Sequence, residues 1–172
     1  FRGSERRRFA RAYQQEAPSL WDVTFQTAVA QAEMEDRSRP GAFHRVEFAV
    51  ADGSESFTIA TTRPELLAAC VGVTAHPDDA RFAHLFGRTA VTPLFRVPVP
   101  IFASELVDRE KGTGILMVCT FGDQTDVQWW RSEGLVLRQI IGNEGRLRPV
   151  DFGKAPFTSL DPVRANAAYA EL

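Results

Sequence analysis

An alternating segment at residues 44–50 is the feature that most constrains the fold of this chain. Its sequence, HRVEFAV, places three apolar side chains on one side of an extended strand. Asp52 and Gly53 follow at a point where a tight turn needs positive φ, and residues 57–60 (FTIA) then run back. The pattern predicts an antiparallel β-hairpin.

Short elements are predicted to continue after this hairpin. Pro64 suits the first position of a short helix over residues 65–70, and Thr62 is placed to cap that helix. Residues 71–75 have the composition of a strand, and a second helix is predicted within residues 77–87.

Proline and glycine divide the remainder of the chain. The prolines within residues 89–102 favour edge strands or the rim of a barrel, because proline cannot donate to a central ladder. Strands are predicted at 115–118 and 136–141, and a turn at 143–145. Residues 23–35 also have the pattern of an extended segment.

These elements lack regular alternation of strand, helix and strand, so they predict an α+β fold with a small mixed, β-barrel-like sheet and short flanking helices. Residues 20–150 would form one domain. The Arg-rich residues 1–19 are interpreted as an N-terminal connecting helix and the Ala-rich residues 151–172 as a C-terminal one. Since the chain begins with Phe1, we interpret it as a piece of a longer protein.

Composition limits the setting of the protein. The 172 residues are 44% hydrophobic and 24% charged, which is ordinary for a soluble globular domain. Cys70 and Cys119 are too few for a disulfide framework, and no apolar run approaches the roughly 20 residues that span a bilayer. We expect a cytoplasmic protein without membrane contact. A net charge of −2 means that nucleic-acid binding would need a local patch or a larger parent protein.

Common catalytic motifs do not occur in this sequence. The three histidines lie in no nucleophile motif, and the HExxH zinc motif, the phosphate-binding loop and the dinucleotide fingerprint are absent. We expect no metal site in this chain.

Two acids that follow the 115–118 strand are the best candidates for a site. Asp123 and Asp126 would lie on one face at the first turn of a helix, where capping alone could explain both. The same arrangement suits a site that binds an ammonium group through charge-assisted hydrogen bonds. Thr61, Thr62 and Arg63 add hydroxyls and a guanidinium that could hold a hydroxyl-bearing or anionic part of a ligand.

Several motifs occur together in a recognisable order. They are Thr61-Thr62-Arg63-Pro64-Glu65, Val97-Pro98-Val99-Pro100-Ile101, Val107-Asp108, Gly112-Thr113-Gly114 and the Asp123/Asp126 pair. Over about residues 20–150 the chain thereby resembles the editing insertion of class I aminoacyl-tRNA synthetases. Asp123 favours the valyl branch, because the isoleucyl branch usually has Gly there. The leucyl branch can also carry Asp at this position.

The resemblance implies a role for each site residue. Asp126 would bind the α-amino group of a mischarged amino acid, and Asp123 would recognise a threonine hydroxyl. Thr61 and Thr62, with Arg63, would line the site near the terminal adenosine and the ester. Hydrolysis would proceed by attack of water without a metal, with Asp126, Thr61 and Thr62 as the catalytic group.

The chain also departs from the valyl pattern. Met117 and Cys119 stand where many valyl relatives have Lys and Thr, and residues 120–122 replace Pro-Ala-His. Cys119 and Thr120 are therefore included as candidate substrate-binding residues that could compensate. The same departures leave open a catalytically inactive module that only positions tRNA.

Partners and cofactors follow from the resemblance. It implies the acceptor end of tRNA(Val) carrying a mischarged threonine ester, contact with the catalytic body of the same chain, and a monomer. Editing itself would need no cofactor. ATP and magnesium would belong to the missing catalytic body, which attaches valine to tRNA.

Overall fold

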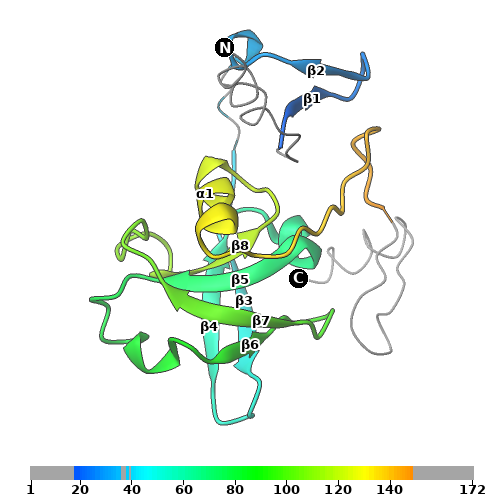
Figure 1. The fold of residues 1–172 in the computed structure, drawn as a ribbon. Coiled ribbons are helices and arrows are strands. Elements are labelled where there is room, and N and C mark those ends of the chain that lie inside the picture. Colours follow the sequence, from blue (N-terminus) through cyan, green and yellow to red (C-terminus); the bar gives the residue numbers. More distant parts are fainter. Residues whose placement is uncertain (1–17, 36–37, 39, 149–172) are drawn as a thin grey trace, which may run out of the picture.

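The computed structural model describes residues 18–35, 38 and 40–148, and its centre is a curled six-stranded sheet (Figure 1). The strands run in the order β4-β3-β6-β7-β5-β8. They are β3 (His44–Val50), β4 (Ser56–Thr61), β5 (Cys70–Ala75), β6 (Thr89–Val91), β7 (Pro98–Ala103) and β8 (Ile115–Cys119). The two outer strands, β4 and β8, contact each other, so the sheet is nearly closed. Because β5 and β7 are parallel and the other pairs are antiparallel, the predicted mixed, barrel-like α+β fold is confirmed.

The predicted hairpin is present as β3 and β4. Val46 pairs with Ile59 and Phe48 with Phe57, and Gly53 has φ of 74° in the turn between the strands. Phe48 is fully buried and stacks on Phe57 with ring centroids 5.9 Å apart. The alternating apolar side chains therefore form one wall of the core.

Of the two positions expected for the proline-bearing segment, an edge strand or a barrel rim, the edge strand was wrong for β7. It lies between β6 and β5, but the two neighbours pair with different halves of it. Pro98 and Pro100 fall in the half that pairs with β6, whereas β5 pairs from Ile101 onward. A strand half with a neighbour on one side only can accommodate residues that lack an N–H.

Helices are short apart from α1 (Gln124–Ser132), which begins at the predicted acids. The 3₁₀ helix η3 (Pro64–Ala69) starts at Pro64 as predicted, but its N-cap is Arg63 without a side-chain cap, so Thr62 does not cap it. The helix predicted within residues 77–87 is reduced to the single 3₁₀ turn η4 (Ala83–Leu85). In the turn before η4, Oδ1 of Asp79 accepts hydrogen bonds from the backbone N–H and the Nε–H of Arg81.

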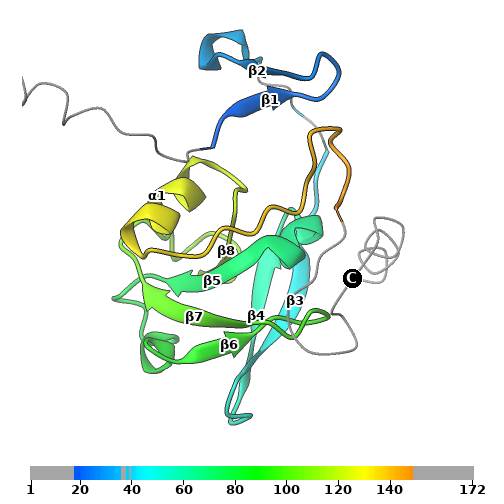
Figure 2. The same cartoon turned by 45° about the vertical axis from the view of Figure 1, so that its right-hand side comes forward.

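Residues 23–35 are not one extended segment. The structure has a separate hairpin of β1 (Leu20–Asp22) and β2 (Thr27–Val29), followed by the 3₁₀ turn η2 (Gln31–Glu33). Asp22 reverses the chain, because its carboxylate accepts the N–H groups of the next turn. In Figures 1 and 2 this hairpin stands apart from the six-stranded sheet.

The strand predicted at 136–141 is absent, and only Ile141 forms a bridge, with Leu147. The backbone of this segment bonds elsewhere, since the N–H of Arg138 goes to the Thr120 hydroxyl and the carbonyl of Ile140 accepts from Arg148. The predicted turn at 143–145 is confirmed by a hydrogen bond from Gly145 N–H to the Gly142 carbonyl.

The ends of the chain are mostly outside the described residues. The connecting helices predicted over 1–19 and 151–172 fall there, apart from residues 18 and 19, which are in no helix. Within the described part, no helix has the length and apolar character needed to cross a membrane.

Candidate functional site

A cavity of about 410 Å³ opens where the end of β4, the end of β8 and the first turn of α1 meet. The loop at residues 104–114 forms another side of it. The polar residues that line the cavity are Thr61, Thr62, Arg63, Asp108, Lys111, Asp123, Thr125 and Asp126. Its apolar lining includes Leu66, Met117 and Trp129.

Asp126 is the most buried of the three aspartates that line the cavity. It sits at the third position of α1 and is 7% exposed. Its Oδ1 accepts the N–H of Cys119 at 3.1 Å, and its Oδ2 accepts those of Gly122 at 2.8 Å and Asp123 at 3.2 Å. Burial, with the nearby charge of Asp123, raises the pKa of the Asp126 carboxyl to about 6 despite these three bonds.

Gly122 lets the backbone come close to this carboxylate. A Cβ at Gly122 would lie 2.5 Å from Oδ2 of Asp126, so a larger residue would displace the acid. The carbonyl of Gly122 accepts a 3.2 Å hydrogen bond from the guanidinium of Arg63. The backbone between β8 and α1 is thus fixed by side chains on both sides.

Asp123 is exposed and caps α1. Its Oδ1 accepts the N–H groups of Thr125 at 2.8 Å and of Asp126 at 3.1 Å. Together with the bond from Asp123 N–H to Asp126 this makes the reciprocal capping box expected from the sequence. Oδ2 takes no part in the cap, which leaves one carboxylate oxygen of a cavity-lining residue available for a ligand.

The residues at the end of β4 meet these acids across the cavity. The hydroxyl of Thr61 accepts the N–H of Arg63 at 3.1 Å, and Arg63 also pairs with Glu65 at 2.9 Å. Thr62 is exposed and lines the cavity. The structure therefore brings the predicted Thr-Thr-Arg group and the two acids into one site.

Cys119 and Thr120, the two residues expected to compensate for the departures, lie on different sides of the structure. Cys119 lines the cavity, its thiol lies 3.4 Å from the Leu66 carbonyl, and hydrogen bonding with Cys70 and burial raise the pKa of the Cys119 thiol. Thr120 is not in this cavity. Its hydroxyl bonds the N–H and the carbonyl of Arg138, both at 3.0 Å, beside a second cavity of about 470 Å³.

The sequence did not predict the cavity lining contributed by the 104–114 loop. Lys111 lines the cavity, and Asp108 and Gly112 were noticed only as parts of a motif. Nothing in their local sequence signals a cavity, since they reach it through the path of the 104–114 loop. The close contact between Gly122 and the Asp126 carboxylate is likewise evident only from the three-dimensional structure.

Comparison with known proteins gives close relatives. The chain is 58% identical to a valine–tRNA ligase of Thermobifida fusca and 55% identical to one of Salinispora arenicola, in each case over 161 residues. These matches cover 94% of this chain. By sequence, this chain belongs to the valine–tRNA ligase family. It spans only 18% of the length of these two relatives.

Other comparisons bear on the fold of this chain. No protein-family model matches the chain. Among solved structures, a leucyl-tRNA synthetase of Agrobacterium radiobacter, in a ternary complex with tRNA and LeuAMS, matches with a TM-score of 0.50 at 20% identity. The match covers 58% of this chain and 16% of that one. The matched part of the fold is therefore shared with a leucyl-tRNA synthetase, while the sequence is similar to valine–tRNA ligases.

Proposed function

We propose that this segment is the editing domain of a valine–tRNA ligase and that its cavity hydrolyses the ester of threonine mischarged on tRNA(Val). The observation that carries the proposal is the acid pair of the cavity. Asp126 is nearly buried and fixed by three backbone N–H groups, and Asp123 keeps an oxygen outside the helix cap. Such a pair of carboxylates can bind two polar groups of one small ligand.

A valine enzyme needs such a site for a physical reason. Threonine is nearly isosteric with valine, so a hydrophobic pocket rejects it by only about 10², a value established for valyl-tRNA synthetases as a class. A second site that requires a hydroxyl can reverse this preference. Valine in that site would leave a buried polar group unpaired.

Asp126 is suited to anchor the α-ammonium group of the ester. A carboxylate offers about four lone-pair positions, and three of them accept backbone N–H groups here. One position on Oδ1 remains for a charged donor. An ammonium group would also stabilise the ionised form of Asp126 and lower its raised pKa.

Asp123 is suited to accept the threonine hydroxyl. Both capping bonds use Oδ1, so the other oxygen can bind a ligand without breaking the start of α1. Loss of this acceptor would remove the difference between a threonine and a valine side chain. We therefore assign the selection of the hydroxyl to Asp123.

The chemical step needs only a positioned water. Its oxygen attacks the ester carbonyl, the carbon–oxygen bond to the ribose breaks, and the proton released from water passes to the ribose oxygen. Thr61, Thr62 or backbone amides orient the water and the carbonyl, and Arg63 lies beside them at the end of β4. This step uses no metal or cofactor, while ATP and magnesium serve the catalytic body that attaches valine.

The chain would act as part of a monomeric cytoplasmic enzyme, in contact with its own catalytic body, on the acceptor end of tRNA(Val).

One observation favours a second candidate, an inactive module that positions tRNA. Met117 and Cys119 line the cavity but offer it neither a charged group nor a hydroxyl. If the parent protein does not hydrolyse Thr-tRNA(Val) and the Met117→Lys, Cys119→Thr double variant does, this alternative is correct. Hydrolysis by the parent protein removes it.

The proposed function is tested by deacylation of preformed Thr-tRNA(Val) and Val-tRNA(Val) by the full-length protein. We expect the parent to hydrolyse the threonine ester selectively and Asp126→Ala to lose this activity. Asp52→Ala, which changes an aspartate at the tip of the β3–β4 hairpin, is the control and should keep it. Hydrolysis at the parental rate by Asp126→Ala would exclude the anchor role.

A further inference from the structure

We infer that Asp79 and Arg81 are positioning residues for this cavity, because they fix the 104–114 loop that forms one of its sides. This inference rests on the proposed function. Neither residue lines the cavity, so both would act through the loop. The loop contributes Leu106, Asp108, Lys111 and Gly112 to the lining.

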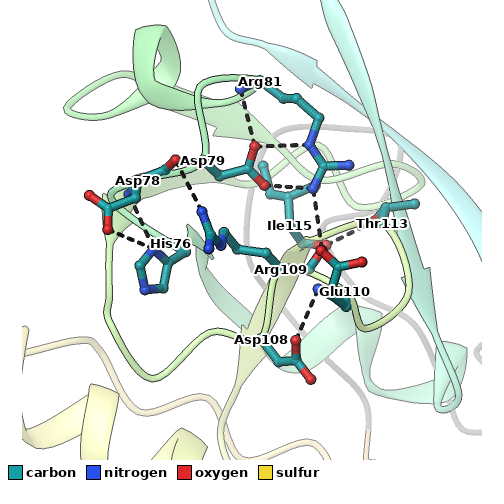
Figure 3. Close-up of polar contacts among 9 residues, drawn as sticks. All are labelled: His76, Asp78, Asp79, Arg81, Asp108, Arg109, Glu110, Thr113 and Ile115. Atoms are coloured by element: carbon teal, nitrogen blue, oxygen red, sulfur yellow. Dashed lines mark hydrogen bonds and ion pairs between the residues drawn. The ribbon is translucent and has the colours of Figure 1, made fainter.

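The middle of the loop is held at Arg109 by a group of charged residues that we call the Asp79 clasp, consisting of Asp79, Arg81 and Arg109 (Figure 3). Asp79 is 5% exposed and bonds the guanidinium of Arg81 through both oxygens, at 2.8 and 2.6 Å. The same guanidinium donates to the carbonyl of Arg109 at 3.3 Å. In return, Arg109 donates to the carbonyl of Asp78 at 3.5 Å.

Gly114 shows how closely the clasp packs against the loop. Its φ is +80°, and a Cβ there would overlap the Arg81 guanidinium and lie 2.9 Å from the Arg109 carbonyl. The clasp is therefore packed directly against the loop backbone at Gly114.

The C-terminal end of the loop is tied to β4. The hydroxyl of Thr113 accepts the N–H of Ala60 at 3.2 Å and donates to the carbonyl of Ile115 at 3.0 Å. Ala60 immediately precedes Thr61. The tie thus sets the distance between the loop and the strand end that carries the proposed water-orienting hydroxyls.

Lys111 and Gly112 lie between these two fixed points. Within the loop, Lys111 N–H donates to the Asp108 carbonyl at 3.2 Å, and Gly114 N–H donates to the Lys111 carbonyl at 3.1 Å. Residues 109–113, which carry the cavity-lining Lys111 and Gly112, are therefore a short turn held at both ends. Release of either end would move the cavity wall relative to Thr61, and a displacement of about 1 Å can cost about 10² in rate.

The test measures single-turnover hydrolysis of Thr-tRNA(Val) by full-length variants, at a temperature well below their unfolding transitions. Asp79→Asn keeps the shape of the side chain but loses the charge that pairs with Arg81. We expect the maximal rate to fall roughly tenfold to a hundredfold. The concentration of enzyme at half-maximal rate should change little, because the clasp lies outside the cavity.

Two matched comparisons separate positioning from general stability. Asp52→Asn breaks an aspartate–arginine pair whose aspartate is more exposed, Asp52 with Arg88 at 2.7 Å, at the hairpin tip, and should leave the rate unchanged. Thr113→Val removes the hydroxyl of the tie and should slow hydrolysis, whereas Thr113→Ser retains it and should restore the rate. This second pair keeps the test usable if Asp79→Asn does not fold.

The outcomes distinguish the two proposals. If the parent does not hydrolyse Thr-tRNA(Val), the proposed function fails and this inference fails with it. If the parent is active and a folded Asp79→Asn hydrolyses at the parental rate, or Thr113→Val does so where Asp79→Asn does not fold, the positioning role alone is overturned. Equal slowing by Thr113→Ser and Thr113→Val would also contradict it.

Discussion

Gly122 donates its backbone N–H to Oδ2 of Asp126 at 2.8 Å, and the absence of a side chain at Gly122 makes this contact possible. The two residues stand on either side of the helix cap Asp123. The glycine thus has a direct role in holding the acid that we assign to ammonium binding.

Replacement of Gly122 by alanine should therefore damage both the fold and the site. The added Cβ would lie 2.5 Å from the carboxylate, so Asp126 must move and lose at least one backbone bond. We expect a loss of about 1–3 kcal/mol in the free energy of unfolding and a clear fall in Thr-tRNA(Val) hydrolysis. Urea unfolding and deacylation measure the two effects. Gly41→Ala, where a Cβ meets nothing within 4 Å, should change neither.

Asp126 should make stability depend on pH in a defined window. Its pKa is raised from 3.8 to about 6, so between these values the folded protein holds a proton that the unfolded chain has lost. The stabilisation is therefore complete below about pH 4 and is lost as the pH rises to about 6. Comparison of urea unfolding of the parent and Asp126→Asn should show this fall only in the parent.

Two other acids act mainly at lower pH. The pKa values of Glu55 and Asp79 are lowered, mainly by hydrogen bonds from His84 and Arg81 respectively, so their contributions are lost as the pH falls through and below their unfolded values of 4.5 and 3.8. A parent protein whose stability rises between pH 4 and 6 relative to Asp126→Asn would contradict the raised pKa of Asp126.

Replacement of Asp123 by alanine should have two separable effects. Loss of the N-cap should cost about 1 kcal/mol of stability. Loss of the proposed hydroxyl acceptor should reduce the ratio of threonine to valine ester hydrolysis. The deacylation rates of the two esters measure the ratio. An unchanged ratio would exclude the selectivity role of Asp123 without bearing on its role as the helix cap.

Parts of the fold that depend on local patterns could be predicted. The alternation at Val46 and Phe48 and the positive φ at Gly53 define the β3–β4 hairpin, and Asp123 marks the start of α1. These features follow from neighbours in the sequence. The prolines of β7 misled the prediction, because the strand changes partners along its length.

Helix spacing predicted the two acids of the cavity, Asp123 and Asp126, but local patterns did not predict its whole lining. Met117 and Cys119 are two residues apart on β8 and both line the cavity, whereas Thr120 follows Cys119 directly and bonds on another side. Inclusion of Thr120 in the site ignored this alternation. The contact between Arg81 and Arg109 joins residues 28 positions apart, which no local pattern indicates.

The central claim is that the acid cavity removes threonine from tRNA(Val), and misacylation tests it most directly. The full-length protein would be supplied with threonine, ATP, magnesium and tRNA(Val), and the accumulation of Thr-tRNA(Val) would be followed over time. We predict that none accumulates with the parent or with Asp52→Ala, and that it accumulates with Asp126→Ala while valine attachment stays normal. Failure of Asp126→Ala to accumulate Thr-tRNA(Val) would contradict the account.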